Sequence, residues 1–170
     1  MQLKALLLSA ALFLAAAACF ADTENRAADD ANAVAQATSQ FYAGLNAMFT
    51  GDVGPMLEVW SHADDVSYMG PDGEFHVGWR DVREVWEAQA ALQLGGQIEP
   101  YQTRITVGTD LAFSQCYEKG SNLDPQGRPV QVSIRATNLF RKENGQWKMI
   151  GHHTDILPFL AEPQHASPAE

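Results

Sequence analysis

The sequence predicts an α+β domain in which a cone-shaped, curved antiparallel sheet wraps around about three N-terminal helices. Apolar residues recur at helical spacing in the first half of the chain, and again in RDVREVWEAQAAL at residues 80–92. Long strand-like segments then follow at about 97–107, 111–120, 130–142 and 146–155. A curved sheet of this kind encloses a cone, which either fills with side chains or holds a ligand.

The first helix is expected from residue 30 to Phe49, because apolar residues recur there every three to four positions. Its buried stripe consists of Val34, Thr38, Phe41, Leu45 and Met48. VGPMLEVW then favours a short second helix, since proline is tolerated in a first helical turn. DDVSYMGPDGEFHVGW favours a hairpin around Asp72-Gly73. The third helix is expected to bury Val82, Val85, Trp86 and Ala90.

The start of the chain predicts that the protein is exported. MQLKALLLSAALFLAAAACFA has a charged start, an apolar run and small residues before Asp22, which is the layout of a signal peptide. We expect a signal peptide at 1–21, a flexible leader at 22–29, a folded domain at 30–157 and a flexible tail at 158–170. The alternative to cleavage after Ala21 is lipidation of Cys19. The sequence therefore predicts a periplasmic or secreted protein.

Charge and motifs exclude several classes. The chain has 11 basic and 21 acidic residues, which argues against binding to nucleic acid or to anionic membranes. No second apolar stretch approaches the roughly 20 residues of a membrane-spanning helix. Cys116 is expected to be a small buried residue. No nucleophile elbow, zinc-protease helix, phosphate loop or dinucleotide fingerprint occurs, so no cofactor is expected.

The last strand, GQWKMIGHHTD at residues 145–155, ends in two histidines and an aspartate. Adjacent residues on a strand point to opposite faces, so His152 and His153 cannot share a metal ion or a pocket. If Asn144-Gly145 is a two-residue turn, His153 lies opposite Ala136. The more apolar face then carries Trp147, Met149, Gly151, His153 and Asp155 beside Val132, Ile134, Ala136, Asn138 and Phe140. A slip of one residue would invert this assignment.

This register predicts a site inside the cone. His153 would act as the acid–base residue, Asp155 would orient it, and Asn138 would anchor the ligand. The apolar walls would be Trp60, Tyr68, Trp86 and Tyr117. The alternative interpretation is that His153 and Asp155 lie at the rim and bind backbone groups, while the four aromatic residues are ordinary core.

Three stretches together resemble the SnoaL-like, nuclear-transport-factor-2-like superfamily over residues 30–157: FYAGLNAMFTGD, the W-x-x-ADDV segment and R-x-T-x-x-FRKENGQWKMIGHH. The resemblance implies a cone-shaped barrel, usually paired as a homodimer through the outer sheet face. GRPVQVSIRATNLFRKENGQWKMIGHH also resembles the kinase association domain, which is an assembly module. Members include isomerases, cyclases, dehydratases and domains with no assigned activity.

The chain departs from the ketosteroid isomerases of this superfamily. Gly70 stands where their catalytic base is expected, Phe41 where their tyrosine donor is expected, and Asn138 where their pocket aspartate falls. Without the base and the tyrosine, ketosteroid isomerase activity is not expected.

Two hypotheses about function remain. The first is an exported protein that binds a small apolar organic molecule, with or without isomerase, cyclase or lyase chemistry. The second is a non-catalytic dimeric module whose working surface is the outer face with Arg135, Thr137, Leu139 and His152.

Overall fold

The computed structural model describes residues 2–124, 126–158 and 160, with side chains from Asn25 onward. Its helices are α1 (Gln2–Met48), α2 (Gly54–Val59) and α3 (Trp79–Leu92). Its strands are β1 (Ser67–Met69), β2 (Phe75–Val77), β3 (Gln97–Val107), β4 (Leu111–Leu123), β5 (Pro129–Glu143) and β6 (Gln146–Thr154). The expected order of helices, hairpin and long strands is confirmed.

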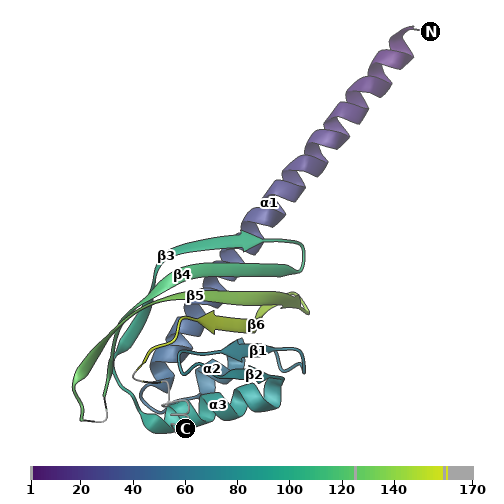
Figure 1. The fold of residues 1–170 in the computed structure, drawn as a ribbon. Helices are drawn as coiled ribbons and strands as arrows, with labels where there is room; N and C mark the ends of the chain where they lie inside the picture. Colours follow the sequence, from purple (N-terminus) through teal and green to yellow (C-terminus); the bar gives the residue numbers. More distant parts are fainter. Residues whose placement is uncertain (1, 125, 159, 161–170) are drawn as a thin grey trace, which may run out of the picture.

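The six strands form one curved sheet in the order β2-β1-β6-β5-β4-β3. Figure 1 shows this sheet curving around the C-terminal half of α1, with α3 near the short strands β1 and β2. Neighbouring strands are antiparallel except β1 and β6, which run parallel with Tyr68 opposite His152. The sheet is therefore mixed rather than purely antiparallel, because the early hairpin joins the last strand along its free edge.

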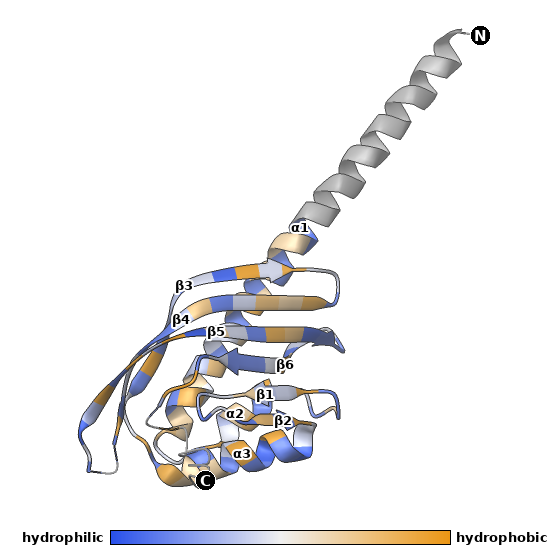
Figure 2. Ribbon diagram, in the orientation of Figure 1, coloured by the Kyte–Doolittle hydropathy of each residue, from blue (hydrophilic) through white to orange (hydrophobic). Residues whose placement is uncertain are grey.

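The core fills the concave side of the sheet. Blue and orange bands alternate along β5, as expected for a strand with one buried face (Figure 2). The predicted stripe on α1 is confirmed: Val34, Thr38, Phe41, Leu45 and Met48 are all buried. On α3, Val82, Trp86 and Ala90 are buried, whereas Val85 is only partly buried. The helices therefore close the cone with the faces that the sequence predicts.

The chain ends are described only in part. Helix α1 runs through residues 22–29, for which a flexible leader was expected. The expected signal peptide at 1–21, including Cys19, has no described side chains, and it stays a prediction. Most of the expected tail lies outside the described residues, but Leu160 packs against the core. Among the described residues, no helix is long and apolar enough to cross a membrane.

A β-bulge in β6 changes the predicted register. Near the turn, Glu143 pairs with Gln146 and Phe140 with Met149, as expected for the Asn144-Gly145 turn. The pairing then shifts at Ile150, so that Asn138 lies opposite His152. One unpaired residue moves every later side chain to the other face of the strand. His152 therefore faces the interior, and His153 faces outward.

Gly96 allows the edge strand β3 to approach β4 closely. Its φ is +80°, and a Cβ added there would lie 1.9 Å from the Ser121 carbonyl oxygen. We expect Gly96→Ala to lower the free energy of unfolding by about 3 kcal/mol or more, because the backbone itself must shift. Gly127→Ala is the matched control, since Gly127 has φ +75° and open space around it. Its cost should stay at about 1–2 kcal/mol. Equal midpoints for the two variants in urea unfolding would contradict this prediction.

Candidate functional site

A cluster of polar side chains lies buried on the concave side of the sheet. Its members are Thr38 and Tyr42 from α1, Ser114, Cys116 and Glu118 from β4, Asn138 from β5, and His152 from β6. The sheet register brings them together, because Ser114 pairs with Asn138 and Asn138 pairs with His152. The alternation of β4 places Ser114, Cys116 and Glu118 on the same inward face. Four elements thus converge on one polar centre inside an apolar core.

Asn138 links the cluster. Its Nδ2 donates to Ser114 Oγ at 3.2 Å and to the Tyr42 hydroxyl at 3.4 Å. Its Oδ1 lies 2.6 Å from His152 Nδ1. An amide oxygen can only accept, so His152 carries its proton on Nδ1 and donates it to Asn138. The other ring nitrogen, Nε2, is then a free acceptor on the side of Glu118.

Glu118 and His152 form a buried acid–base pair. His152 Nε2 lies 3.8 Å from Glu118 Oε1. Burial raises the pKa of Glu118 to about 7, although a hydrogen bond from Tyr42 to Oε1 at 3.1 Å lowers it in part. Burial lowers the pKa of His152 to about 3, and the neighbouring charge of His153 adds to this. Because the His152 imidazole is neutral near pH 7, Glu118 and His152 do not form an ion pair, and their contact joins two polar groups.

Aromatic rings produce this desolvation. The His152 ring lies 4.8 Å from the Phe41 ring and is stacked on the Tyr68 ring at 5.7 Å. Tyr68 in turn contacts Trp86 at 4.5 Å between ring centroids. These rings exclude water from the imidazole and so disfavour its charged form.

A cavity of about 40 Å³ lies beside the pair. Glu118, His152, Asn122 and Gln89 supply its polar lining. The remaining wall is apolar and includes Phe49, Tyr68, Trp86, Ile98, Ile134 and Leu157. This volume suits about one water molecule. The site is therefore an apolar chamber with one ionisable carboxyl group tuned to neutral pH.

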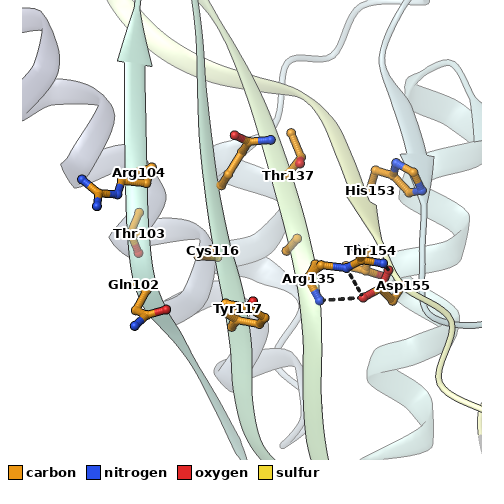
Figure 3. A pocket seen from close by; sticks show the side chains of 12 residues that line it. Gln102, Thr103, Arg104, Cys116, Tyr117, Arg135, Thr137, His153, Thr154 and Asp155 are labelled. Atoms are coloured by element: carbon orange, nitrogen blue, oxygen red, sulfur yellow. Dashed lines mark hydrogen bonds and ion pairs between the residues drawn. The ribbon is translucent and has the colours of Figure 1, made fainter.

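The predicted positions of His153 and Asp155 are wrong. His153 is exposed on the outer face. It lines a broad hollow there of about 770 Å³, and Figure 3 shows its side chain among the others that line this hollow. Asp155 accepts hydrogen bonds from the Arg135 guanidinium at 2.8 and 2.9 Å, which lower its pKa to about 2. Asp155 is thus engaged by Arg135 and does not orient a histidine inside the cone. The physical reason is the bulge at Ile150.

The predicted ligand walls divide into two groups. Tyr68 and Trp86 are buried and line the cavity, and Trp60 is buried against Trp86 without lining it. Asn138 is fully buried and inward, as predicted. The prediction for Tyr117 is wrong: its side chain is 42 % exposed and lines the hollow on the outer face of the sheet.

Sequence reasoning missed Glu118, His152 and Tyr42. Phe41 was expected at the position of a tyrosine donor, but the next residue, Tyr42, brings its hydroxyl to Asn138 and Glu118. Glu118 had a readable signal, since it shares the inward parity of Ala112, Ser114 and Cys116 on β4. His152 had none, because a bulge leaves no mark in a sequence that is otherwise regular. Within the described residues, no three His, Cys, Asp or Glu side chains form a group that could hold a metal ion.

Comparison with known proteins agrees with this architecture. A family described as the SnoaL-like domain matches residues 34–157. The solved structure of a proposed dehydratase of the nuclear-transport-factor-2-like family from Streptomyces avermitilis has a TM-score of 0.68 and 24 % identity. That match covers 78 % of this chain and 99 % of the other.

Two further structures share the fold. A proposed calcium/calmodulin-dependent protein kinase type II association domain from Thiobacillus denitrificans has a TM-score of 0.60 and 23 % identity, covering 71 % of this chain and 92 % of its own. A proposed ketosteroid isomerase from Shewanella frigidimarina has a TM-score of 0.57 and 20 % identity, with the same two coverages. At these identities, the likeness shows the fold alone.

A curated F-box protein from Arabidopsis thaliana is 26 % identical over 102 residues, which are 60 % of this chain. The chain spans only 41 % of the length of that relative. The family match covers most of the chain, from Val34 on α1 to three residues beyond the end of β6. The chain therefore belongs to the SnoaL-like family and has the cone fold of the nuclear-transport-factor-2-like superfamily.

Proposed function

We propose that the protein binds a small, mainly apolar molecule inside the cone and moves a proton on it, as isomerases and dehydratases do. The observation that carries this proposal is Glu118, a buried carboxyl group beside an apolar cavity with a pKa near 7. A general base works best when its pKa is close to the working pH. Perturbed carboxyl groups of this kind cluster at functional sites.

Each polar residue has a role in this proposal. Tyr42 donates to Glu118 Oε1 and fixes the carboxyl group, which leaves Oε2 for the proton of the substrate. Asn138 holds the tautomer of His152, so that Nε2 accepts a hydrogen bond from a hydroxyl group of the bound molecule. The aromatic wall excludes water, which strengthens these polar interactions.

The apolar stretch at residues 1–21 supports the further proposal that the protein is exported.

The proton-transfer proposal predicts catalysed hydrogen exchange. Purified protein in D₂O should speed deuterium uptake next to the carbonyl group of methyl ketones, followed by NMR. Glu118→Gln should lower this rate by about 10²–10⁴-fold, because the amide cannot take up the proton. His153→Asn is the control and should keep the wild-type rate, since its side chain is exposed on the outer face. The proposal would be contradicted if Glu118→Gln exchanged hydrogen at the wild-type rate. It would also be contradicted if the wild-type protein did not speed exchange in any of the methyl ketones.

The raised pKa of Glu118 also predicts a pH dependence of stability. The folded protein keeps this proton up to about pH 7, whereas the unfolded chain loses it near pH 4.5. The stability from this group is present below pH 4.5 and is lost as the pH rises to 7. Glu118→Gln should therefore gain stability relative to the wild type over that range, on the order of 3 kcal/mol.

Urea unfolding of both proteins at several pH values measures this difference. His152, whose pKa is lowered, gives the opposite slope between about pH 3 and 6.5, but it is present in both proteins and cancels. A difference that does not change with pH would mean that Glu118 titrates as an exposed carboxyl group.

A second candidate function is assembly. The outer sheet face exposes large hydrophobic side chains on adjacent strands: Tyr101, Phe113, Tyr117 and Leu139. Phe113 pairs with Leu139, and Tyr101 pairs with Tyr117, so they form neighbouring pairs on one surface. His153, rather than His152, belongs to this surface. These exposed apolar side chains support a homodimer formed through the outer face.

Light scattering should therefore show a dimer at micromolar concentration. Leu139→Glu should shift the protein toward the monomer, because it would bury a charge in the interface. Val77→Glu serves as control, since Val77 is also apolar and exposed but lies on β2, an edge strand of the sheet. A monomeric wild type, or equal effects of the two variants, would argue against this interface.

A further inference from the structure

The broad hollow on the outer face of the sheet has a volume of about 770 Å³. The side chains that line it come from the four strands β3, β4, β5 and β6 (Figure 3). Its volume falls within the roughly 300–1,000 Å³ of small-molecule sites. The proposed proton transfer takes place on the opposite face of the sheet, so this hollow is available for a different ligand.

One row of polar side chains crosses the hollow. The register places Arg104 beside Gln115, and Thr137 beside His153. Gln115 and Thr137 are themselves paired, so the row is continuous across four strands. Its two ends are three strand spacings apart, or about 14 Å at the backbone. None of these four side chains has a hydrogen bond or an ion pair with another described residue, so all four can contact a ligand.

Two bulges direct side chains toward this hollow. In β3 the pairing shifts between Tyr101 and Arg104, and Gln102 has a φ of +57°. Three consecutive side chains, from Gln102 to Arg104, are therefore exposed and line the same hollow, which a regular strand would not allow. A positive φ is unfavourable for a residue with a Cβ, and such strain clusters at functional sites. At the other end of the row, the bulge at Ile150 turns His153 outward.

The lining of the hollow is basic, although the protein is acidic. Its charged members among the described residues are Arg104, Arg135 and Asp155, whereas the whole chain has 11 basic and 21 acidic residues. Arg135 and Asp155 pair with each other, so the positive charge of Arg104 is the one without a counter-charge. Asp155 accepts from Nε and Nη2 of Arg135, which leaves the Nη1 donors of this guanidinium for a ligand.

The order of these groups defines the ligand. The guanidinium of Arg104 favours a carboxylate at one end of the row. His153 and the Nη1 donors of Arg135 offer N–H groups to a second acceptor at the other end. A compact anion such as phosphate cannot reach both ends. Between them, Gln115 and Thr137 present an amide and a hydroxyl group, which pair with hydroxyl groups rather than with an apolar chain.

We propose that the outer hollow binds a linear, hydroxylated dicarboxylate. One carboxylate binds Arg104, and the hydroxyl groups of the ligand bind Gln115 and Thr137. The second carboxylate accepts hydrogen bonds from His153 and Arg135. This binding site lies outside the cone and is independent of the proposed proton transfer.

The site is compatible with the proposed dimer. The row lies between two apolar pairs of the outer face, Phe113 with Leu139 on one side and Tyr101 with Tyr117 on the other. A second copy that rested on those pairs would close the hollow into a chamber. Burial of an unpaired Arg104 in such a chamber is costly, so a bound carboxylate would stabilise the dimer as well.

Three six-carbon acids test the chemistry of the ligand. D-Glucarate has both carboxylates and the hydroxyl groups, D-gluconate lacks one carboxylate, and adipate lacks the hydroxyl groups. Calorimetric titration measures each dissociation constant at one ionic strength, because salt screens exposed charges. The wild type should bind glucarate about tenfold more tightly than either of the others, the value of one hydrogen bond to a charged group. Equal affinities for glucarate and gluconate, or no binding of glucarate at millimolar concentration, would overturn the proposed ligand.

Arg104→Gln tests the charged end of the row. This variant should lose most of the preference for glucarate over gluconate, because the amide keeps a donor but not the charge. Arg80→Gln is the matched control and should keep the preference, since it removes the same charge from an exposed arginine on α3. Equal losses in the two variants would mean that only the net charge of the protein matters, and the site would be wrong.

Thr137→Val tests the middle of the row. Valine keeps the shape of threonine without its hydroxyl group, so the preference for glucarate over adipate should fall severalfold. Ser133→Ala removes a hydroxyl group from the same face of β5 outside the hollow, and it should keep the preference. The same loss in both variants would contradict the placement of the ligand along the row.

This inference and the proposed reaction fail separately. Glu118→Gln should bind glucarate as the wild type does, because Glu118 is buried on the inner face. Glucarate binding that depends on Arg104, in a protein without exchange activity, would support this inference and remove the proposed reaction. Hydrogen exchange in a protein that does not bind glucarate would do the reverse.

Discussion

The extra residue at Ile150 in β6 decides the chemistry of the interior. Before it, Trp147 and Met149 face the core; after it, His152 and Thr154 do. The partner of β6 changes at the same place, because Trp60 bridges to Met149 whereas β1 begins its pairing at Gly151. The bulge thereby aligns His152 with Asn138 on one side and Tyr68 on the other. Bulges commonly redirect a side chain beside a functional site, and this one selects which histidine is desolvated.

The second constraint is the burial of Glu118 itself. A carboxyl group with 4 % exposure is costly when charged, so the folded protein holds its proton to a higher pH than the unfolded chain does. Tyr42 offsets part of that cost by donating to Oε1, and its hydroxyl oxygen in turn accepts from Asn138 Nδ2. The cluster is linked through Asn138, whose hydrogen bonds reach β4, β6 and α1. A network with satisfied members stabilises one arrangement of the core, and here that arrangement leaves one oxygen of Glu118 free.

The two faces of the sheet differ in their electrostatics. On the outer face, Arg135 and Asp155 pair in water, and the carboxylate stays ionised. Among the described residues that are buried on the inner face, no arginine or lysine accompanies Glu118, so desolvation governs its pKa. A carboxyl group therefore stays ionised on the outer face, at Asp155, and holds its proton to a higher pH on the inner face, at Glu118. The inner face has the buried carboxyl group that the proposed proton transfer needs, and the outer face has the exposed side chains that the proposed dimer needs.

The sequence by itself determined the fold class, the order of the elements and the buried faces of α1 and β5, because apolar periodicity depends only on local geometry. It also placed Asn138 in the interior, since β5 is regular from Val132 to Phe140. Beyond Met149 the prediction failed for His153 and Asp155, because a bulge depends on how β6 meets Trp60 and β1 rather than on its own residues. The prediction for Tyr117 failed for a related reason, because the inward face of β4 was not assigned from the sequence. The alternation along β4 would have placed Tyr117 outside and Glu118 inside. Only the tertiary structure decided that Glu118, His152 and Tyr42 meet, because they lie on three elements brought together by the curvature of the sheet around α1.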